Sequence, residues 1–151
     1  MKNFESVDDV LDFAINNEIR ANKFYLELAD RMDRPAMKEA FLEFAEEEKK
    51  HEQMLLRIKE GHKLDAAADK VKDLQIGDYL VDAETSPTMS YQEALILAIK
   101  REKSAMMLYT DLAARTDDGQ LQRLFSSLAQ EEAKHKLRFE TEYDENVFKE
   151  N

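Results

Sequence analysis

Residues 11–51 of the chain repeat in residues 95–135 at a constant offset of 84 positions, without a gap. The repeated apolar residues follow the 3.6-residue spacing of one buried helix face. The matched pairs are Leu11 and Leu95, Ala14 and Ala98, Ile15 and Ile99, Tyr25 and Tyr109, Leu28 and Leu112, Ala29 and Ala113, Phe41 and Phe125, and Ala45 and Ala129. Each half holds two such patterns around a short turn. The sequence therefore predicts an αα-hairpin that occurs twice, and two hairpins bury their apolar faces best as a four-helix bundle.

Capping and turn residues set the expected bounds of the helices. Ser6 precedes Asp9 by three positions and Ser90 precedes Glu93 by three, which is the spacing of an N-cap. Gly61 is an expected helix stop. The tail after position 144 is expected to fray. The four expected helices span residues 6–32, 35–60, 90–115 and 120–143.

The connection over residues 62–88 has weak periodicity and contains Gly77 and Pro87. We expect one short helical turn in it, around Ala66–Val71. Its 27 residues are enough to run the length of a 26-residue helix, about 39 Å. A crossover of this kind gives an up-down-down-up bundle, and it would also allow the hairpins to exchange between two chains. We interpret residues 1–151 as a single all-α domain.

Composition excludes several classes of function. With 3 glycines, 2 prolines and many Ala, Leu, Glu and Lys residues, the chain is typical of a helical protein. A net charge of −11 argues against nucleic-acid binding, because a phosphate backbone requires a basic face. The absence of cysteine excludes disulfides and thiolate metal sites in this sequence. No leader pattern and no membrane-spanning run is visible, so we expect a cytoplasmic location.

Acidic residues interrupt the apolar stripes at repeat-equivalent positions. The stripe of the first helix includes Glu18, and that of the third helix includes Glu102. Thirty residues after each of them the sequence reads Glu-x-x-His on the inward face of the next helix. These motifs are Glu48 with His51 and Glu132 with His135.

Inward carboxylates need positive partners, because burying each ion costs several kcal/mol. Four Glu side chains carry −4, which two divalent cations would balance. The i, i+3 spacing places Glu and His on one helix face, so both can reach one ion. Mixed carboxylate and imidazole ligands suit iron or manganese. The alternative is a set of solvated i, i+3 contacts, which is the common role of such a pair when it occurs alone.

Other candidate residues have simpler expected roles. His62 follows the helix stop and is expected to be exposed. Tyr25 and Tyr109 are expected in the core, with hydrogen bonds to ligand carboxylates as the alternative. Met106 and Met107 are expected to fill core space. Three further glutamates are expected on solvated faces: Glu46, Glu47 and Glu131.

The chain resembles the rubrerythrin branch of the ferritin-like di-iron superfamily. The segments that carry the resemblance are "NEIRANKFYLELA", "FAEEEKKHEQML", "KREKSAMMLYTDLA" and "LAQEEAKHKLRF". The resemblance implies a ferritin-like four-helix bundle with two iron ions per site, for which manganese or zinc could substitute. It implies reduction of hydrogen peroxide or dioxygen, in a homodimer. The implied ligands, and hence catalytic residues, are Glu18, Glu48, His51, Glu102, Glu132 and His135.

Two departures from the rubrerythrin pattern alter the expected function. Rubrerythrins usually carry a rubredoxin domain with an iron–tetracysteine site, and this sequence has none, so a separate donor protein is expected to supply electrons. Rubrerythrins also carry a further carboxylate three residues past a helix Glu, where this chain has Ala21 and Ala105. The remaining ligand set is similar to that of bacterioferritin. Oxidation of Fe²⁺ for storage or detoxification is therefore the alternative to peroxide reduction, and a bundle used for interaction alone is a third hypothesis.

Overall fold

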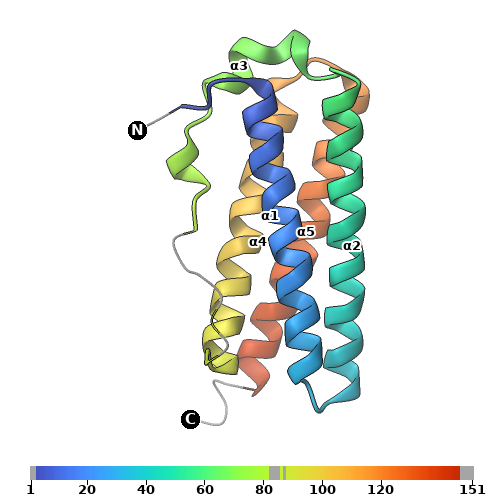
Figure 1. Cartoon of the computed structure of the whole chain (residues 1–151), viewed down its shortest axis with the longest axis vertical. Coiled ribbons are helices and arrows are strands. Elements are labelled where there is room, and N and C mark those ends of the chain that lie inside the picture. The colour runs from blue at the N-terminus through green and yellow to red at the C-terminus, as the bar shows by residue number, and fades with distance from the viewer. Residues whose placement is uncertain (1–2, 82–85, 87, 147–151) are drawn as a thin grey trace. The chain divides into compact units, whose positions relative to one another are not determined.

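The computed structural model describes residues 3–81, 86 and 88–146, apart from the side chain of Asn146 (Figure 1). All regular elements within these ranges are helices, which confirms the all-α class. The long helices are α1 (Val7–Arg31), α2 (Pro35–Glu60), α4 (Tyr91–Arg115) and α5 (Gly119–Asn146), and a short α3 covers Ala68–Lys72. None of the described helices is long and apolar enough to cross a membrane.

The chain divides into two compact units. One unit covers residues 3–74 and contains α1, α2 and α3. The other contains α4 and α5 and covers the described residues from Gln75 onward. In each unit the two long helices pack against each other as an antiparallel hairpin (Figure 1). The two predicted hairpins are thus confirmed, while the prediction of a single domain over residues 1–151 stays a prediction.

The first hairpin begins and ends where its capping residues predict. The Ser6 hydroxyl accepts a hydrogen bond from the Asp9 N–H at 3.0 Å and caps α1. Pro35 occupies the first turn of α2, where its missing N–H costs nothing. Gly61 ends α2 as predicted, but it has a helical φ of −84°. The residue in the left-handed region is His62, at φ 52°.

The second hairpin begins with the predicted capping box. The Ser90 side chain accepts from the Glu93 N–H at 3.1 Å, and the Glu93 carboxylate accepts from the Ser90 N–H at 3.4 Å. Asp118 Oδ1 accepts from the Gln120 N–H at 2.8 Å, so α5 starts one residue before the predicted position. The helix continues to Asn146, past the predicted end at Tyr143, and the expected fraying after Asp144 is wrong as far as residue 146. Residues 147–151 lie outside the described residues.

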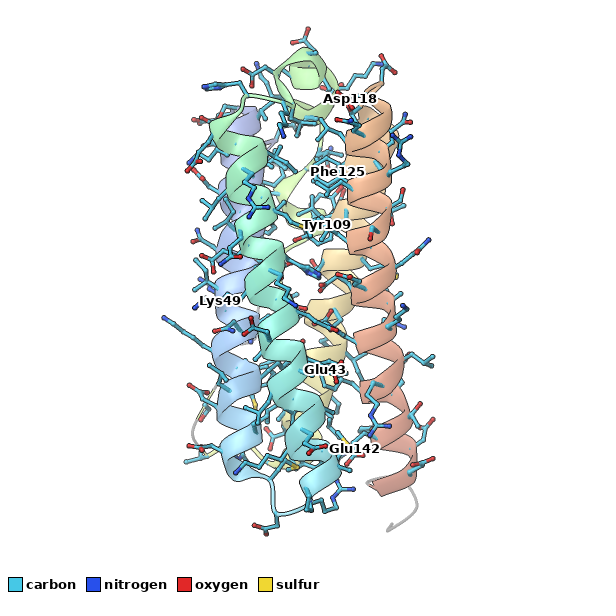
Figure 2. The ribbon with its side chains drawn as sticks, turned by 90° about the vertical axis from the view of Figure 1, so that its right-hand side faces the viewer. Glu43, Lys49, Tyr109, Asp118, Phe125 and Glu142 are labelled. Carbon is cyan, nitrogen blue, oxygen red and sulfur yellow. The ribbon has the colours of Figure 1, made fainter. Side chains whose placement is uncertain are left out.

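The predicted stripes form the cores of the hairpins. The apolar residues matched in the repeat are buried, except Ile99 and Ala113, which are half-buried. Tyr25 meets Phe44 edge-on, with ring centroids 6.4 Å apart. Tyr109 and Phe125 lie one above the other in the second hairpin (Figure 2), with stacked rings 6.5 Å apart. The two tyrosines are repeat-equivalent but their ring partners are not, because Phe125 is the equivalent of Phe41 and the equivalent of Phe44 is Leu128.

The segment between α2 and α4 contains more structure than its sequence indicates. The predicted helical turn is present as a 3₁₀ turn over Asp65–Ala67 followed by α3. A second 3₁₀ turn over Ile76–Asp78 was not predicted. Just after it, the Tyr79 carbonyl accepts from the Ser104 hydroxyl at 2.5 Å, and the Tyr79 hydroxyl donates to Asp111 Oδ2 at 2.5 Å. These two bonds attach the end of the segment to α4.

Candidate metal centre

The first unit brings together the Glu and the Glu-x-x-His motif of the first repeat. Glu18 comes from the middle of α1, and Glu48 and His51 come from adjacent turns of α2. Each of these side chains is only 1% exposed. One ligand atom from each lies within 4.8 Å of the ligand atoms of the other two. His51 Nδ1 is 3.5 Å from Glu18 Oε2 and 4.0 Å from Glu48 Oε2.

The second unit repeats this triplet with Glu102 on α4 and with Glu132 and His135 on α5. These side chains too are 1% exposed, and their ligand atoms lie within 4.8 Å of one another. His135 Nδ1 is 3.7 Å from Glu102 Oε2. All six residues predicted as ligands therefore occupy inward positions, in two triplets of the same composition.

The geometry and chemistry of each triplet fit a divalent metal ion. The Nδ1–Oε2 distances of 3.5–4.0 Å are longer than a hydrogen bond, which rarely exceeds about 3.2 Å. Two donor atoms that each lie about 2.1 Å from one ion are about 3–3.4 Å apart, so a small inward movement would complete the coordination. Among the described residues, the fully buried charged side chains are glutamates and histidines, while half-buried Arg101 has one buried guanidinium nitrogen. Carboxylate oxygen and imidazole nitrogen are ligands that iron and manganese accept.

Comparison with known proteins decides the family. The rubrerythrin family model matches residues 9–92 and 93–150, which is nearly the whole chain. The chain belongs to the rubrerythrin family. Among proteins of curated function, none matches the sequence.

Two solved structures are similar to this member of the rubrerythrin family. One is a Thermotoga maritima protein assigned as a ferritin-like diiron-carboxylate protein, with a TM-score of 0.81, 23% identity, and coverage of 97% of this chain and 100% of that one. The other is a hypothetical protein from Pyrococcus furiosus, with a TM-score of 0.68, 25% identity, and coverage of 89% and 86%. The first similarity confirms the ferritin-like fold class.

The usual further carboxylate of rubrerythrins has no counterpart at the expected positions. Ala21 is buried and Ala105 is half-buried, so both lie on the inner side of their helices, but neither carries a ligand atom. Glu46 is exposed as predicted, while Glu47 and Glu131 are half-buried. In this respect the chain differs from the pattern typical of the rubrerythrin family.

Sequence reasoning missed a hydrogen bond next to the first triplet. Asn22 Nδ2 donates to the Ala45 carbonyl oxygen at 2.6 Å and so connects α1 to α2. Asn22 lies one turn after Glu18, and Ala45 lies one turn before Glu48. The repeat-equivalent residue of Asn22 is Met106, which cannot donate this bond. A comparison of the two halves position by position could have identified Asn22.

A buried carboxylate outside the triplets was also missed. Glu142 on α5 is 5% exposed, and its Oε1 accepts a hydrogen bond from the Tyr91 hydroxyl at 2.9 Å. The repeat-equivalent residues are Ile58 and Val7, so an apolar pair in the first hairpin corresponds to a polar pair in the second.

Two further predictions concern single residues. His62 is exposed as predicted, while Met107 is 38% exposed, which shows that its predicted core role is wrong.

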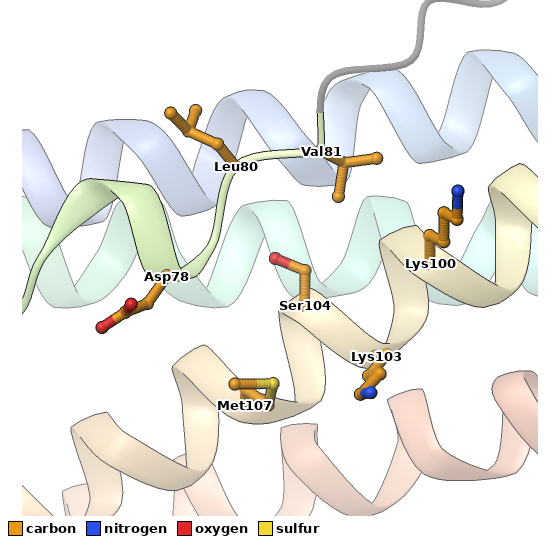
Figure 3. A pocket seen from close by; sticks show the side chains of 7 residues that line it. All are labelled: Asp78, Leu80, Val81, Lys100, Lys103, Ser104 and Met107. Carbon is orange, nitrogen blue, oxygen red and sulfur yellow. The ribbon is translucent and has the colours of Figure 1, made fainter.

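An open pocket of about 510 Å³ lies on α4 beside the end of the connecting segment (Figure 3). It contains none of the six predicted ligand residues. Its lining combines two lysines with apolar groups: Asp78, Leu80, Val81, Lys100, Lys103, Ser104 and Met107. The Ser104 hydroxyl already donates to the Tyr79 carbonyl. The pocket is therefore a surface feature of the second unit, separate from the triplet of that unit.

Proposed function

We propose that the two triplets together hold two iron ions and that this centre reduces hydrogen peroxide or dioxygen. Membership of the rubrerythrin family and the ferritin-like fold support the proposal. The proposed ligands, and hence the catalytic residues, are Glu18, Glu48, His51, Glu102, Glu132 and His135.

The observation that carries this proposal is the burial of four carboxylates in two equivalent triplets. Each of these glutamates is 1% exposed, and no fully buried lysine or arginine is found among the described residues, where half-buried Arg101 has one buried guanidinium nitrogen. Leaving four buried carboxylates uncompensated would cost several kcal/mol for each ion. Two divalent cations cancel the charge of four glutamates. Each histidine can bind a metal ion through a nitrogen of its neutral imidazole ring.

The side chains of the chain have distinct parts in this reaction. The four carboxylates would hold the metal ions together with the two histidines and would balance the charge of the ions. Two ferrous ions supply the two electrons that cleavage of an O–O bond requires. The apolar stripes on both sides of each triplet, with Tyr25 and Phe41 in the first unit and Tyr109 and Phe125 in the second, keep water away from the ligand residues. A separate donor protein would supply the electrons that restore the ferrous state. We propose the cytoplasm as the location of the protein and a homodimer as its assembly.

Oxidation of Fe²⁺ for storage or detoxification is the second candidate function. The specific observation in its favour is that Ala21 and Ala105 occupy the positions of the further rubrerythrin carboxylate. A storage function requires a closed shell of many chains, so the mass of the iron-loaded protein in solution separates the two candidates. A dimer contradicts storage, and a shell of about twenty-four chains supports it.

Stopped-flow oxidation of the protein tests the proposal. The protein is loaded anaerobically with two Fe²⁺ per chain and mixed with hydrogen peroxide or with dioxygen. We expect rapid oxidation by at least one of them, and faster oxidation by peroxide supports the first candidate. A loaded protein that neither oxidant converts faster than free Fe²⁺ would overturn both candidates and favour a role in interaction only.

A further inference from the structure

The two triplets have the same ligand residues, but the charges around them differ. Four positions on either side of a ligand residue correspond to about one helical turn. In the first hairpin these positions hold as many positive as negative charges: Arg20, Glu46, Glu47, Lys49, Lys50 and Glu52. In the second hairpin the equivalent positions hold Lys100, Arg101, Lys103, Glu131, Lys134, Lys136 and Arg138. The surroundings of the first triplet are therefore neutral, whereas those of the second carry +5.

This difference does not depend on where the compared range ends. Two more positions at each end of the ranges add Asp12, Lys23, Glu43 and Arg57 to the first hairpin, whose net charge stays zero. The same extension adds Glu140 to the second hairpin, which lowers its net charge to +4. The Glu140 carboxylate pairs with the Lys136 ammonium group at 3.1 Å. The second triplet thus has a positive environment in a chain whose total charge is −11.

Arg101 is the positive residue that we expect to act most strongly on the second triplet. It directly precedes Glu102, it is half-buried, and one of its guanidinium nitrogens is buried. A partly buried charge is screened less by water and salt than an exposed one. The equivalent residue in the first hairpin is neutral Asn17, which is half-buried too. The two hairpins therefore place the same kind of ligand residue behind different sequences, Asn-Asn-Glu in the first and Lys-Arg-Glu in the second.

A hydrogen bond between the helices adds a second difference in the same direction. The bond from Asn22 to the Ala45 carbonyl joins α1 to α2 at 2.6 Å, within one turn of Glu18 and Glu48. Met106 occupies the equivalent position in the second hairpin and cannot donate such a bond. Ligand residues that are already held in place lose less conformational freedom when an ion binds. This bond therefore favours binding at the first triplet.

We propose that the first triplet binds a divalent cation more tightly than the second, so that the ion at the second triplet is the one that exchanges with the solution. Positive side chains repel a cation, and this repulsion weakens binding where they gather. The first ion bound by a chain then occupies Glu18, Glu48 and His51, and the second triplet fills at a higher metal concentration. This inference rests on the proposed function, because it requires that both triplets bind metal.

Repeat-equivalent substitutions measure each triplet by itself. Glu132→Gln weakens the second triplet and leaves the first intact, and Glu48→Gln does the reverse. Mn²⁺ is the probe, and titration calorimetry of the metal-free proteins gives its dissociation constants. We expect Mn²⁺ to bind Glu132→Gln at least ten-fold more tightly than Glu48→Gln. Equal or reversed affinities would overturn this inference and leave the proposed function in place. A natural chain that binds neither Mn²⁺ nor anaerobic Fe²⁺ would overturn both.

A reciprocal exchange of charges tests the cause of the difference. Lys100→Asn with Arg101→Asn, made in the Glu48→Gln chain, gives the second triplet the neutral residues of the first. Asn16→Lys with Asn17→Arg, made in the Glu132→Gln chain, does the opposite. We expect the dissociation constant for Mn²⁺ to fall at least three-fold in the first case and to rise at least three-fold in the second. Both changes should shrink in 0.5 M salt, because salt screens charges.

Two controls accompany the exchange of charges. Lys63→Asn lies beyond the end of α2, is exposed in the natural chain, and should leave both dissociation constants unchanged. Lys100→Asn alone changes an exposed residue, so it tests the same effect even if loss of half-buried Arg101 lowers the helicity seen by circular dichroism. It should shift binding in the same direction as the double substitution. Dissociation constants that none of these exchanges alters would overturn the electrostatic basis of the proposal.

The position of the first ion can also be observed directly. Crystals of the natural chain grown with one Mn²⁺ per chain should give their strongest anomalous peak at Glu18, Glu48 and His51. A second peak at Glu102, Glu132 and His135 should appear when the metal is in excess. A stronger peak at the second triplet in the first crystals would contradict the proposed order of filling.

Discussion

At the scale of single residues, the two triplets show how strongly a buried charge constrains a sequence. Glu48 and His51 are separated by one helical turn, so they share a face with the apolar residues before and after them. Both are 1% exposed, as the interrupted apolar stripe predicts. A surface glutamate can be replaced at little cost, but an ionised glutamate at these positions costs several kcal/mol unless a positive partner balances its charge.

The first prediction concerns the stoichiometry of the centre. Glu132→Ala removes one carboxylate from the second triplet, and we expect iron loading to fall below two ions per chain because that triplet loses a ligand. Metal content after loading and desalting is measured by plasma emission spectroscopy. Glu131→Ala, one position away and half-buried, is the control and should load normally. Full loading of Glu132→Ala would remove this residue from the ligand set.

A second prediction tests the bond between Asn22 and the Ala45 carbonyl. Asn22→Ala should lower the free energy of unfolding by about 1 kcal/mol, which is typical of one lost hydrogen bond. Asn16→Ala on the exposed side of the same helix corrects for the higher helix propensity of alanine. Urea unfolding of the metal-free proteins gives both values. Equal stabilities of the two variants would mean that this bond contributes nothing.

The residues predicted as ligands could be recognised from their near neighbours in the sequence. The missed residues interact with partners that are far away in the sequence. The burial of the six proposed ligand residues was predictable because each disturbs a local pattern within its own helix, while their role as ligands stays a prediction. The bonds from Asn22 to Ala45 and from Tyr91 to Glu142 join residues 23 and 51 positions apart. Their side chains are ordinary for a helix surface, so no local pattern marks them.

At the scale of the elements, the helix ends are determined by nearby residues in the sequence. The structure of the connecting segment is determined by residues far away in the sequence. Ser6, Ser90 and Pro35 fix the starts of three helices through bonds or backbone geometry within four residues. The segment before α4 is instead held by Tyr79, whose partners Ser104 and Asp111 are 25 and 32 residues away. Its 3₁₀ turn was therefore not predictable from the periodicity of the sequence.

The third prediction concerns Tyr79. Burial, and then the hydrogen bond that the hydroxyl donates to Asp111, raise the pKa of Tyr79 above its ordinary value of 10.0. Because the folded state holds this proton more tightly, its contribution to stability is complete below pH 10 and is lost as the pH rises further. Tyr79→Phe should lower the free energy of unfolding at pH 8 by about 1.5–3 kcal/mol, as expected for a bond to a charged group.

Denaturant unfolding at pH 8 to 11 measures both effects of Tyr79. The natural chain should lose stability above pH 10 more steeply than Tyr79→Phe, so the two curves converge. Tyr143→Phe is the control, because the Tyr143 hydroxyl accepts a longer bond, of 3.3 Å, from exposed Gln92. Parallel curves for the natural chain and Tyr79→Phe would contradict the role of the phenol proton.

At the scale of the whole molecule, the repeat predicted the fold class correctly because it specifies the same hairpin twice. It did not predict the differences between the hairpins, such as the polar pair of Tyr91 and Glu142 in place of Val7 and Ile58. Ile58 and Glu142 are both buried, so this difference lies at an inward position. The shared stripe marks which positions face inward, but it does not say where a polar pair replaces an apolar one.

The fourth prediction links metal binding to the stability of the molecule. A ligand that binds only the folded chain stabilises it by about 2.7 kcal/mol at a free concentration 100 times its dissociation constant. For a chain of this size we expect the melting temperature to rise by roughly 5–10 °C when Mn²⁺ is added to the metal-free protein. Scanning calorimetry measures the shift, and Glu48→Gln with Glu132→Gln should abolish it. An equal shift in that variant would mean that the ion binds elsewhere.

The constant offset between the hairpins also bears on descent. Equal spacing of Glu, Glu and His in both halves is what duplication and fusion of a gene for one hairpin would produce. In a fused chain each hairpin can change without the other, and outward positions such as Leu42 and Ser126 do differ.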